Sequence, residues 1–548
     1  MVRMPTPDEI AALRQALAEA LGRNEALNAE LHVAANELRS TTGELRVVRT
    51  ERDLLKEQLN RFKRQLFDAK SEASATHQKD MFFNEAEGEG AQAQPAAEEV
   101  EEGEDQIDVP AYKRVKRGRK PLDPALPREV VRHELPADER VCPHDGAALR
   151  EIGVETSEQL DIIPQQVRVL RHERVKYACP CCDGGLRLAQ KPPQVIPKGL
   201  LSEAALAWVI TSKYLDGLPL YRQAALLGRF GGTELSRNTL AASVVRVGQA
   251  TQPVINLLRD ALLDSFIVHG DETEVQVLKE SGRKAQTKSY MWVQMTQASG
   301  RDGTGPPVRL FGYSPSRSTQ AARTLYEGMR PGGALMSDGY EPYAAIAQQH
   351  RLVHLGCWAH CRRYFHEALQ ALPKDKRGPE QLPARFIELI GLLYKVEVQA
   401  RDAALDVQAL QRRRQMHSKP VLAQMEALAL QHLHGVLPGS LLGKALHYVT
   451  AQWRKLVRYV EDGRYPIDNN ACENAIRPFV VGRRNWLFAD TVAGANASAN
   501  LYSLLQTCLA NGIDGYQYLK ALLIELPKAR TVDDYEALLP WRFALAAR

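Results

Sequence analysis

The feature that most constrains the fold is the order of strand and helix patterns after residue 263. Short apolar stretches rich in β-formers predict five strands, at 265–269, 289–297, 308–313, 333–337 and 352–357. Helical patterns at 318–329, 341–349 and 359–371 separate or follow the later strands. Residues 380–460 are helical throughout, and a last helical region begins near Asn469. This order predicts an α/β unit over residues 263–526.

Three acidic residues have a special place in this order. Asp271 follows the first predicted strand, Asp338 follows the fourth, and Glu473 lies on the late helix. Three strands, a helix, a strand, a helix and a strand is the order of a ribonuclease-H-like sheet, in which strands one and four are neighbours. Carboxylates at their ends would converge, and a helix crossing the sheet would add the third. A single Asp after a strand is usually a turn residue, so the prediction depends on all three positions together.

Three converging carboxylates suit phosphodiester chemistry. Hard divalent cations such as Mg²⁺ or Mn²⁺ prefer carboxylate oxygens. Two such ions, roughly 3.5–4 Å apart, can activate an attacking oxygen and stabilise the leaving one. Water or a DNA 3′-hydroxyl is then the nucleophile, and no nucleophilic side chain is needed. We therefore predict that Asp271, Asp338 and Glu473 are catalytic residues that bind two metal ions.

Arginines accompany Glu473 on its helix. Arg477 and Arg484 lie four and eleven residues after Glu473, near one helical face, and Arg483 is adjacent. This pattern predicts DNA binding, because arginine recognises phosphate through paired hydrogen bonds. The alternative is an exposed salt bridge between Glu473 and Arg477, contributing about 0.3–0.5 kcal/mol.

The N-terminal segment repeats every seven residues. Leu17, Leu31 and Leu38 share one heptad position and Leu27 occupies the position three residues later, in a pattern that runs through most of residues 8–75. Such a repeat predicts a coiled coil through which the chain self-associates, as a dimer or a larger assembly. Asn24 at a core position would specify the register. The alternative is one amphipathic helix that packs on its own chain.

Residues 82–127 contain two opposite charge patterns. Ten acidic residues and no basic ones lie between Glu85 and Asp108, which predicts a disordered acidic linker. The stretch KRVKRGRK at 113–120 then holds six Lys or Arg in eight residues. Its Arg117, Arg119 and Lys120 surround a glycine in an AT-hook-like sequence that would enter a narrow minor groove. Generic phosphate contact is the alternative.

A cysteine module is predicted over residues 128–198, and a helical region over 199–255. Cys142, Cys179, Cys181 and Cys182 cluster in the module, and alternation within 154–176 suggests a small hairpin between them.

The pattern of the helical region predicts a helix, a glycine turn and a second helix, with Ser236 as the N-cap of the second helix. Arg237 and Asn238 in its first turn are placed as in a helix-turn-helix reading base edges; an ordinary helical hairpin is the alternative.

The chain resembles the insertion sequence 66 family of bacterial transposases, a branch of the DDE group. The stretches that carry the resemblance extend over nearly the whole chain: RQLFDAKSE, GRKPL, KYLDGLPLYRQ, VHGDETEV, LMSDGYEPY, HLGCWAHCRRYF, DNNACENAIRPFVVGRRNWLF and LYSLLQTCLANGIDGYQYL. The resemblance implies that Asp271, Asp338 and Glu473 form the catalytic triad. It also implies that helices between about 375 and 460 interrupt the catalytic fold, and that accessory proteins of the same element take part.

The resemblance points to different roles for two groups of cysteines. The family's zinc region has two C-x2-C pairs, but here Asp145 stands where Cys142 would have its partner. Cys142, Cys179 and Cys182, with His144 or Asp145, would bind one structural Zn²⁺; the alternative is a module without metal. Cys357 and His360 match a C-x2-H signature of several DDE families. We interpret them as structural support beside the active site, since one Cys–His pair is weak evidence for zinc.

These features together predict a DNA transposase. The protein would bind the terminal inverted repeats of a bacterial insertion sequence, cleave at the element ends and join the 3′-hydroxyls to target DNA. The alternatives are a nuclease that cuts without joining and a catalytically inactive DNA-binding regulator. The start of the chain lacks a signal-peptide pattern and no apolar run suits a membrane helix, which predicts a cytoplasmic, nucleoid-associated protein without a membrane partner. Residues 527–548 would be a C-terminal tail.

Overall fold

The computed structural model describes parts of residues 15–41, then 167–174, 176–178, 186–188, 190–231 and 235–542. The described residues between 15 and 41 are helical, as the heptad pattern predicts. Strands β1 (Lys176–Ala178) and β2 (Leu186–Leu188) pair antiparallel. The predicted hairpin is wrong for residues 167–174, which have no regular secondary structure. All eight are exposed, so their alternating apolar side chains gain no burial that would stabilise a strand.

A mixed sheet forms the centre of the α/β unit. Its strands are β3 (Ile267–Lys279), β4 (Lys288–Thr296), β5 (Val308–Ser314), β6 (Ala334–Ser337) and β7 (Val353–Gly356). They lie in the order β5-β4-β3-β6-β7, and a short strand β8 (Ala489–Thr491) pairs with the far part of β3. The five predicted strands are confirmed, and the first and fourth are neighbours as predicted, paired in parallel.

One detail of the prediction is wrong. Asp271 lies inside β3 and does not follow it, because β3 continues through an antiparallel pairing with β4 that reaches Gln276 and through the pairing with β8. The parallel pairing of β3 with β6 ends at His269 and Met336. Asp271 and Asp338 therefore each lie two residues beyond the same registered pair.

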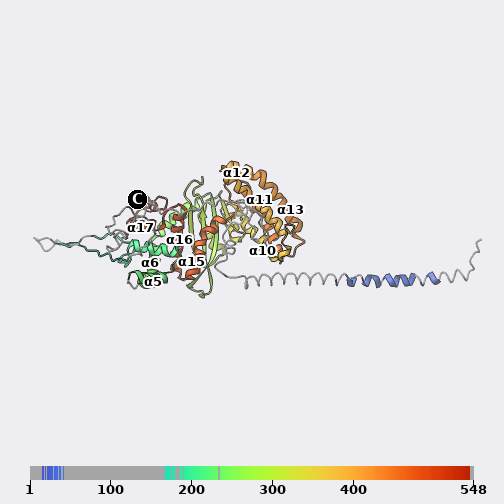
Figure 1. Cartoon of the computed structure of the whole chain (residues 1–548), viewed down its shortest axis with the longest axis horizontal. Coiled ribbons are helices and arrows are strands. Elements are labelled where there is room, and N and C mark those ends of the chain that lie inside the picture. The colour runs from blue at the N-terminus through green and yellow to red at the C-terminus, as the bar shows by residue number, and fades with distance from the viewer. Residues whose placement is uncertain are drawn as a thin grey trace, which may run out of the picture. The chain divides into compact units, whose positions relative to one another are not determined.

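Helices cover both faces of the sheet. The predicted helices correspond to α8 (Thr319–Leu325), α9 (Glu341–Gln349) and α10 (Trp358–Ala371). Helices α15 (Asn470–Trp486) and α16 (Val492–Ala510) pack along β3, β4 and β5 (Figure 1). Since side chains alternate along a strand, β3 presents His269 and Asp271 toward α15 and Glu272 toward α9.

The helices before the sheet and at the end of the chain join the same core. They are α4 (Glu203–Tyr214), α5 (Leu220–Gly231), α6 (Arg237–Ala250), α7 (Gln252–Leu263), α17 (Gly515–Glu525) and α18 (Val532–Ala537), with a 3-10 turn at Leu526–Lys528. The predicted N-cap is confirmed: the Ser236 hydroxyl accepts a hydrogen bond from the Thr239 backbone N–H at 3.1 Å. Among the described helices, none has both the length and the apolar composition for crossing a bilayer.

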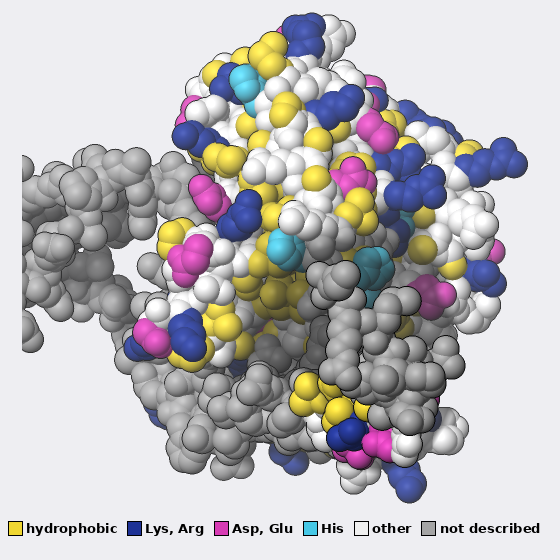
Figure 2. All heavy atoms as spheres, turned by 90° about the vertical axis from the view of Figure 1, so that its right-hand side faces the viewer, with side chains coloured by type: hydrophobic (Ala, Val, Ile, Leu, Met, Phe, Trp, Pro, Cys, Tyr) yellow, Lys and Arg dark blue, Asp and Glu magenta, His cyan; other side chains and the backbone are white. Residues whose placement is uncertain are grey.

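A second apolar core lies beyond β7. It is built by α10 with α11 (Leu382–Asp402), α13 (Lys419–Leu433), α14 (Leu441–Leu456) and a 3-10 turn at Val457–Val460. The same stretch of chain also contains a 3-10 turn at Lys374–Lys376, α12 (Val407–Arg413) and a π-helical turn (Arg414–Ser418). These helices separate β7 and α10 from α15 in the chain. The face of the molecule in Figure 2 mixes basic, acidic and apolar side chains.

Candidate active site

Asp271 and Asp338 are held by local hydrogen bonds at the point where the parallel pairing of β3 and β6 ends. Asp271 Oδ1 accepts from the Glu272 backbone N–H at 2.9 Å, and Asp338 Oδ1 accepts from the Tyr340 backbone N–H at 2.9 Å. The Ser337 hydroxyl donates to the Asp338 carbonyl oxygen at 3.0 Å and lies 2.9 Å from His354 Nε2. The turn after β6 is thereby fixed, and both carboxylates are set by backbone structure.

Glu473 reaches the same place through the start of α15. Asn469, the N-cap of this helix, is fully buried and donates from Nδ2 to the Gly270 carbonyl oxygen at 3.0 Å. Its Oδ1 lies 3.0 Å from His269 Nδ1. Because Nδ2 already faces Gly270, Oδ1 is the acceptor and His269 Nδ1 carries the hydrogen. The first turn of α15, with Glu473, is thus pinned to the two residues that precede Asp271.

The three carboxylates are largely buried, and their charges act on one another. Burial raises the pKa of Asp271 well above its usual range, and the charges of Glu272, Asp338 and Glu473 raise it further. Burial likewise raises the pKa values of Asp338 and Glu473. The positive charge of the Arg363 guanidinium lowers both pKa values, but by less than burial raises them. Buried carboxylates that repel one another form a stable anionic site only with a cation. Their oxygen donors fit hard divalent ions.

Glu272 is a fourth carboxylate that the sequence reasoning missed. Its Oε2 accepts a hydrogen bond from the Tyr343 hydroxyl of α9 at 2.7 Å. Burial raises the pKa of Glu272 to about 7, and the Asp338 charge contributes while the Arg317 guanidinium opposes. The only sequence signal was its position directly after Asp271, and a neighbour in a strand usually points to the opposite face.

Basic side chains from three elements surround the carboxylates. Arg363 of α10 lies with Nη2 3.4 Å from Glu473 Oε2 and is 48% exposed, so it can also face a ligand. Arg317, before α8, and Lys455, on α14, both act on the charge of Asp338. The exposed Arg317 guanidinium also stacks over the Tyr340 ring, 4.8 Å from its centroid. These residues provide positive charge for a phosphate beside the carboxylates.

The predicted DNA-binding residues are distributed differently. Arg483 donates from Nη1 to the Thr273 hydroxyl of β3 at 3.1 Å, so it ties α15 to the sheet. Arg484 is exposed and Arg477 is partly buried on the same helix. Arg237 and Asn238 are exposed at the start of α6. Outside the described residues lie Arg117, Arg119, Lys120, Cys142, His144, Asp145, Cys179, Cys181 and Cys182.

The structure brings Cys357 and His360 to Glu473. Cys357 is fully buried at the N-cap of α10, and its sulfur accepts a hydrogen bond from the Asn469 backbone N–H at 3.2 Å. His360 Nδ1 lies 3.4 Å from Glu473 Oε1, and burial lowers the pKa of His360 to about 3, so the imidazole is neutral. Trp358, between them, is core: its Nε1 donates to the Leu456 carbonyl oxygen at 2.9 Å.

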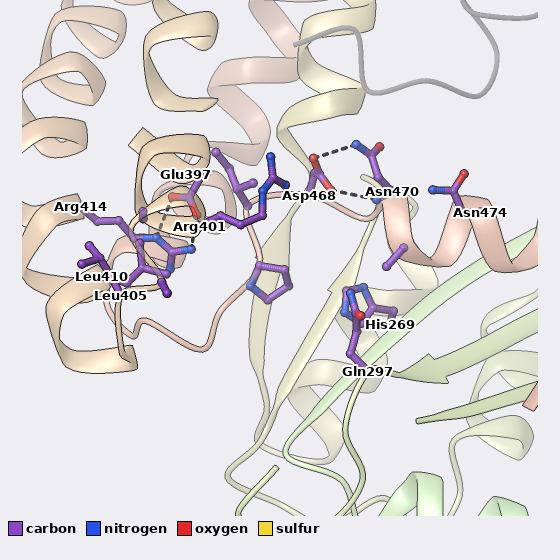
Figure 3. A pocket seen from close by; sticks show the side chains of 15 residues that line it. His269, Gln297, Glu397, Arg401, Leu405, Leu410, Arg414, Asp468, Asn470 and Asn474 are labelled. Atoms are coloured by element: carbon purple, nitrogen blue, oxygen red, sulfur yellow. Dashed lines mark hydrogen bonds and ion pairs between the residues drawn. The ribbon is translucent and has the colours of Figure 1, made fainter. Parts of the chain in front are cut away.

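A cavity of about 400 Å³ adjoins this part of the sheet (Figure 3). His269, Asp468, Asn470 and Asn474 line one side, and residues of α11 and α12 line the other. Asp468 is held in its wall by the Tyr394 hydroxyl, which donates at 2.6 Å, and by the Asn470 side chain at 2.9 Å. The cavity separates the start of α15 from the helices of the second core.

Comparisons with known proteins agree with this arrangement. The model of the transposase IS66 family matches residues 198–497. Three further models match: the zinc-finger binding domain of transposase IS66 at 139–183, the IS66 C-terminal element at 503–541, and "Transposase C of IS166 homeodomain" at 54–131. Two similar proteins of Sinorhizobium fredii carry the names "Uncharacterized protein y4qI" and "Uncharacterized protein y4jD". The first is 32% identical to this chain, over 73% of this chain and 74% of its own length. The second is 31% identical, over 75% of this chain and 79% of its own length.

Proposed function

Because this chain belongs to the IS66 family of transposases, we propose that it is a DNA transposase whose catalytic residues are Asp271, Asp338 and Glu473. The observation that carries the proposal is their convergence: two carboxylates follow the same registered strand pair, and Asn469 links the helix of the third to that pair. The strand order β5-β4-β3-β6-β7 supports a ribonuclease-H-like catalytic fold. The helices from α11 to α14 would be an insertion in it.

The residues of the site have different roles in phosphodiester cleavage and joining. Mg²⁺ or Mn²⁺ ions, held by the three carboxylates, would activate the attacking oxygen and stabilise the leaving one. Arg363, Arg317 and Lys455 bind the phosphate and balance its charge. Tyr343 holds Glu272 in place beside Asp271. The nucleophile is water in cleavage at the element end and the 3′-hydroxyl of the element in joining.

Recognition of the terminal inverted repeats belongs to the part of the chain before the sheet. Helix α6 presents Arg237 and Asn238 to solvent, as a recognition helix does. The basic segment with Arg117, Arg119 and Lys120 and the cysteine module, with one Zn²⁺ at Cys142, Cys179 and Cys182, would add contacts to the same DNA. Exposed Arg484 and the partly buried Arg477 would follow the phosphates near Glu473.

Self-association is the role that we assign to the N-terminal helix. The described heptad leucines are all exposed: Leu17, Leu27, Leu31 and Leu38 each have more than half of their surface accessible. A stripe of exposed leucines at heptad spacing is stable in water only when a partner helix covers it. Pairing of two chains would bring two active sites to the two ends of one element, with accessory proteins of the element as further partners.

The test is an assay of cleavage and joining on DNA that carries the element ends. Asp271→Asn, Asp338→Asn and Glu473→Gln should each lose both reactions while still binding the ends. Glu341→Gln, which changes an exposed carboxylate at the start of α9, is the matched control and should keep both. Joining of pre-cut ends by any of the three variants would contradict the proposal. End binding by the wild type without cleavage or joining would favour the inactive regulator.

A further inference from the structure

Three ligand atoms of different chemistry meet beside the proposed catalytic site. One atom each from Cys357, His360 and Glu473 lies within 4.8 Å of the other two. Cys357 and His360 come from the N-terminal turn of α10, and Glu473 comes from α15. The pair in α10 was weak evidence for a metal by itself. Tertiary structure adds a third ligand that is more than a hundred residues away in the chain.

Two of these atoms are buried without a hydrogen bond. His360 Nδ1 and Glu473 Oε1 are both shielded from solvent, and neither has a hydrogen-bond partner among the described residues. They lie 3.4 Å apart but not in hydrogen-bond geometry. Buried polar atoms are normally paired, and leaving one unpaired costs about 1–3 kcal/mol. A cation between the two atoms would satisfy both at once.

The sulfur of Cys357 is prepared for the same role. It accepts the Asn469 backbone N–H at 3.2 Å and stands at the start of α10, so its position toward the other two ligand atoms is fixed. Burial raises the pKa of the Cys357 thiol well above its usual range, so a bound cation would have to displace the proton. Cys357 forms no disulfide. A sulfur, an imidazole nitrogen and one carboxylate oxygen are the donor set of Zn²⁺ and similar ions, whereas Mg²⁺ prefers oxygen alone.

We propose that Cys357, His360 and Glu473 bind one divalent cation of the Zn²⁺ class, in a site separate from the hard-cation site of Asp271 and Asp338. This inference rests on the proposed function in one respect, which is that Glu473 is shared by the two sites. Its Oε1 faces His360, and its Oε2 faces Arg363. An ion on Oε1 would fix the orientation of the carboxylate and leave Oε2 directed toward the phosphate-binding side.

Cobalt binding tests the site directly. Full-length protein freed of metal is titrated with Co²⁺, and the thiolate-to-cobalt absorption and the bound cobalt per chain are measured. The difference between wild type and Cys357→Ser isolates this site from the cysteine module. We expect Cys357→Ser and His360→Asn to bind one Co²⁺ fewer per chain. Cys361→Ser is the matched control, because Cys361 is a buried cysteine of the same helix outside the cluster. Equal cobalt binding by all four proteins would overturn the proposal.

Two further measurements distinguish failure of this proposal from misfolding of a variant and from failure of the proposed function. Far-UV circular dichroism and thermal melting identify a variant that fails to fold; His360→Asn then decides if Cys357→Ser does not fold. Asp271→Asn should lose DNA joining but keep the cobalt absorption. Loss of that absorption in Asp271→Asn would place the ion among the catalytic carboxylates and overturn the separate site only. Joining by Asp271→Asn with the absorption intact would overturn the proposed function only.

Discussion

Asn469 donates a hydrogen bond from its side-chain amide to the carbonyl oxygen of Gly270, the residue directly before Asp271. The bond joins the N-cap of α15 to the strand that carries Asp271, the first of the proposed catalytic residues. Asn469 also approaches His269 through Oδ1 and Cys357 through its backbone N–H. One buried amide therefore sets the position of Glu473 relative to both Asp271 and the Cys357–His360 pair.

Replacement of Asn469 should uncouple α15 from the sheet. Asn469→Ala leaves the Gly270 carbonyl and the His269 ring without partners, which costs about 1–3 kcal/mol in the free energy of unfolding. We expect joining activity to fall by more than tenfold, because a misplacement of about 1 Å in a catalytic group has an effect of this order. Chemical denaturation and a joining assay measure the two effects.

The control for Asn469 is Asn511→Ala. Asn511 also donates from Nδ2 to a backbone carbonyl, that of Pro307 at 3.0 Å, but at a distance from the carboxylates. It should lose comparable stability and keep its activity at a temperature where it remains folded. Equal loss of joining by both variants would mean that Asn469 acts through stability alone.

Glu272 should make the metal-free protein less stable as pH rises. Burial raises its pKa from 4.5 to about 7 in the folded state, so the folded protein binds the proton more strongly than the unfolded chain. Stability is then fully present below pH 4.5 and falls as pH rises through about 7. We expect Glu272→Gln to gain Tm relative to the wild type in EDTA as pH rises over this window, since glutamine still accepts from Tyr343 and carries no charge.

Glu274→Gln provides the comparison for this pH series. Glu274 lies two residues further along β3, is 52% exposed and pairs with Lys288 at 2.7 Å. Its replacement should leave the slope of Tm against pH as in the wild type. Equal slopes of Tm against pH in the wild type and in Glu272→Gln would contradict the assignment of Glu272 as a buried acid.

Gly270 has no space for a side chain. A Cβ atom there would contact the Tyr326 hydroxyl and approach Tyr343 Cε1 to 2.7 Å, and both rings are fully buried. Gly270→Ala must displace the tyrosine that holds Glu272, so we expect a loss of about 1–3 kcal/mol in unfolding free energy, measured by denaturant titration. Gly391→Ala, in α11 with no atom within 4 Å of the new Cβ, should be neutral or stabilising.

Arg414 should hold the second core together. Its guanidinium is 3% exposed, pairs with both oxygens of Glu397 at 2.7 and 2.8 Å, and donates to the carbonyl oxygens of Tyr459, Asp462 and Tyr465. Arg414→Met leaves the Glu397 charge and three carbonyls unpaired, at a cost of about 3–5 kcal/mol. Thermal unfolding measures the loss. Arg412→Met, an exposed change two residues earlier, should alter stability by less than about 0.5 kcal/mol.

The order of the strands and the Ser236 cap could be predicted from local patterns, and the same patterns singled out Asp271 and Asp338 as candidate catalytic residues. Apolar periodicity, a turn residue after a strand and an N-cap serine act over a few neighbouring residues, so each leaves a signal in the sequence. The same local signals were wrong where tertiary pairing decided the outcome. Asp271 lies within β3 because β4 and β8 extend that strand. Residues 167–174 are exposed and form no strand, although their apolar side chains alternate.

The sequence by itself determined the five main strands, the helices between them, and the choice of Asp271, Asp338 and Glu473 as candidate catalytic residues. Only the tertiary structure decided that Asn469 ties Glu473 to β3, that Glu272 is buried against Tyr343, and that Cys357 and His360 meet Glu473. These relationships join residues from about 70 to 200 positions apart. They arise from strand register and helix packing, which depend on the whole core and leave no pattern in any short stretch of sequence.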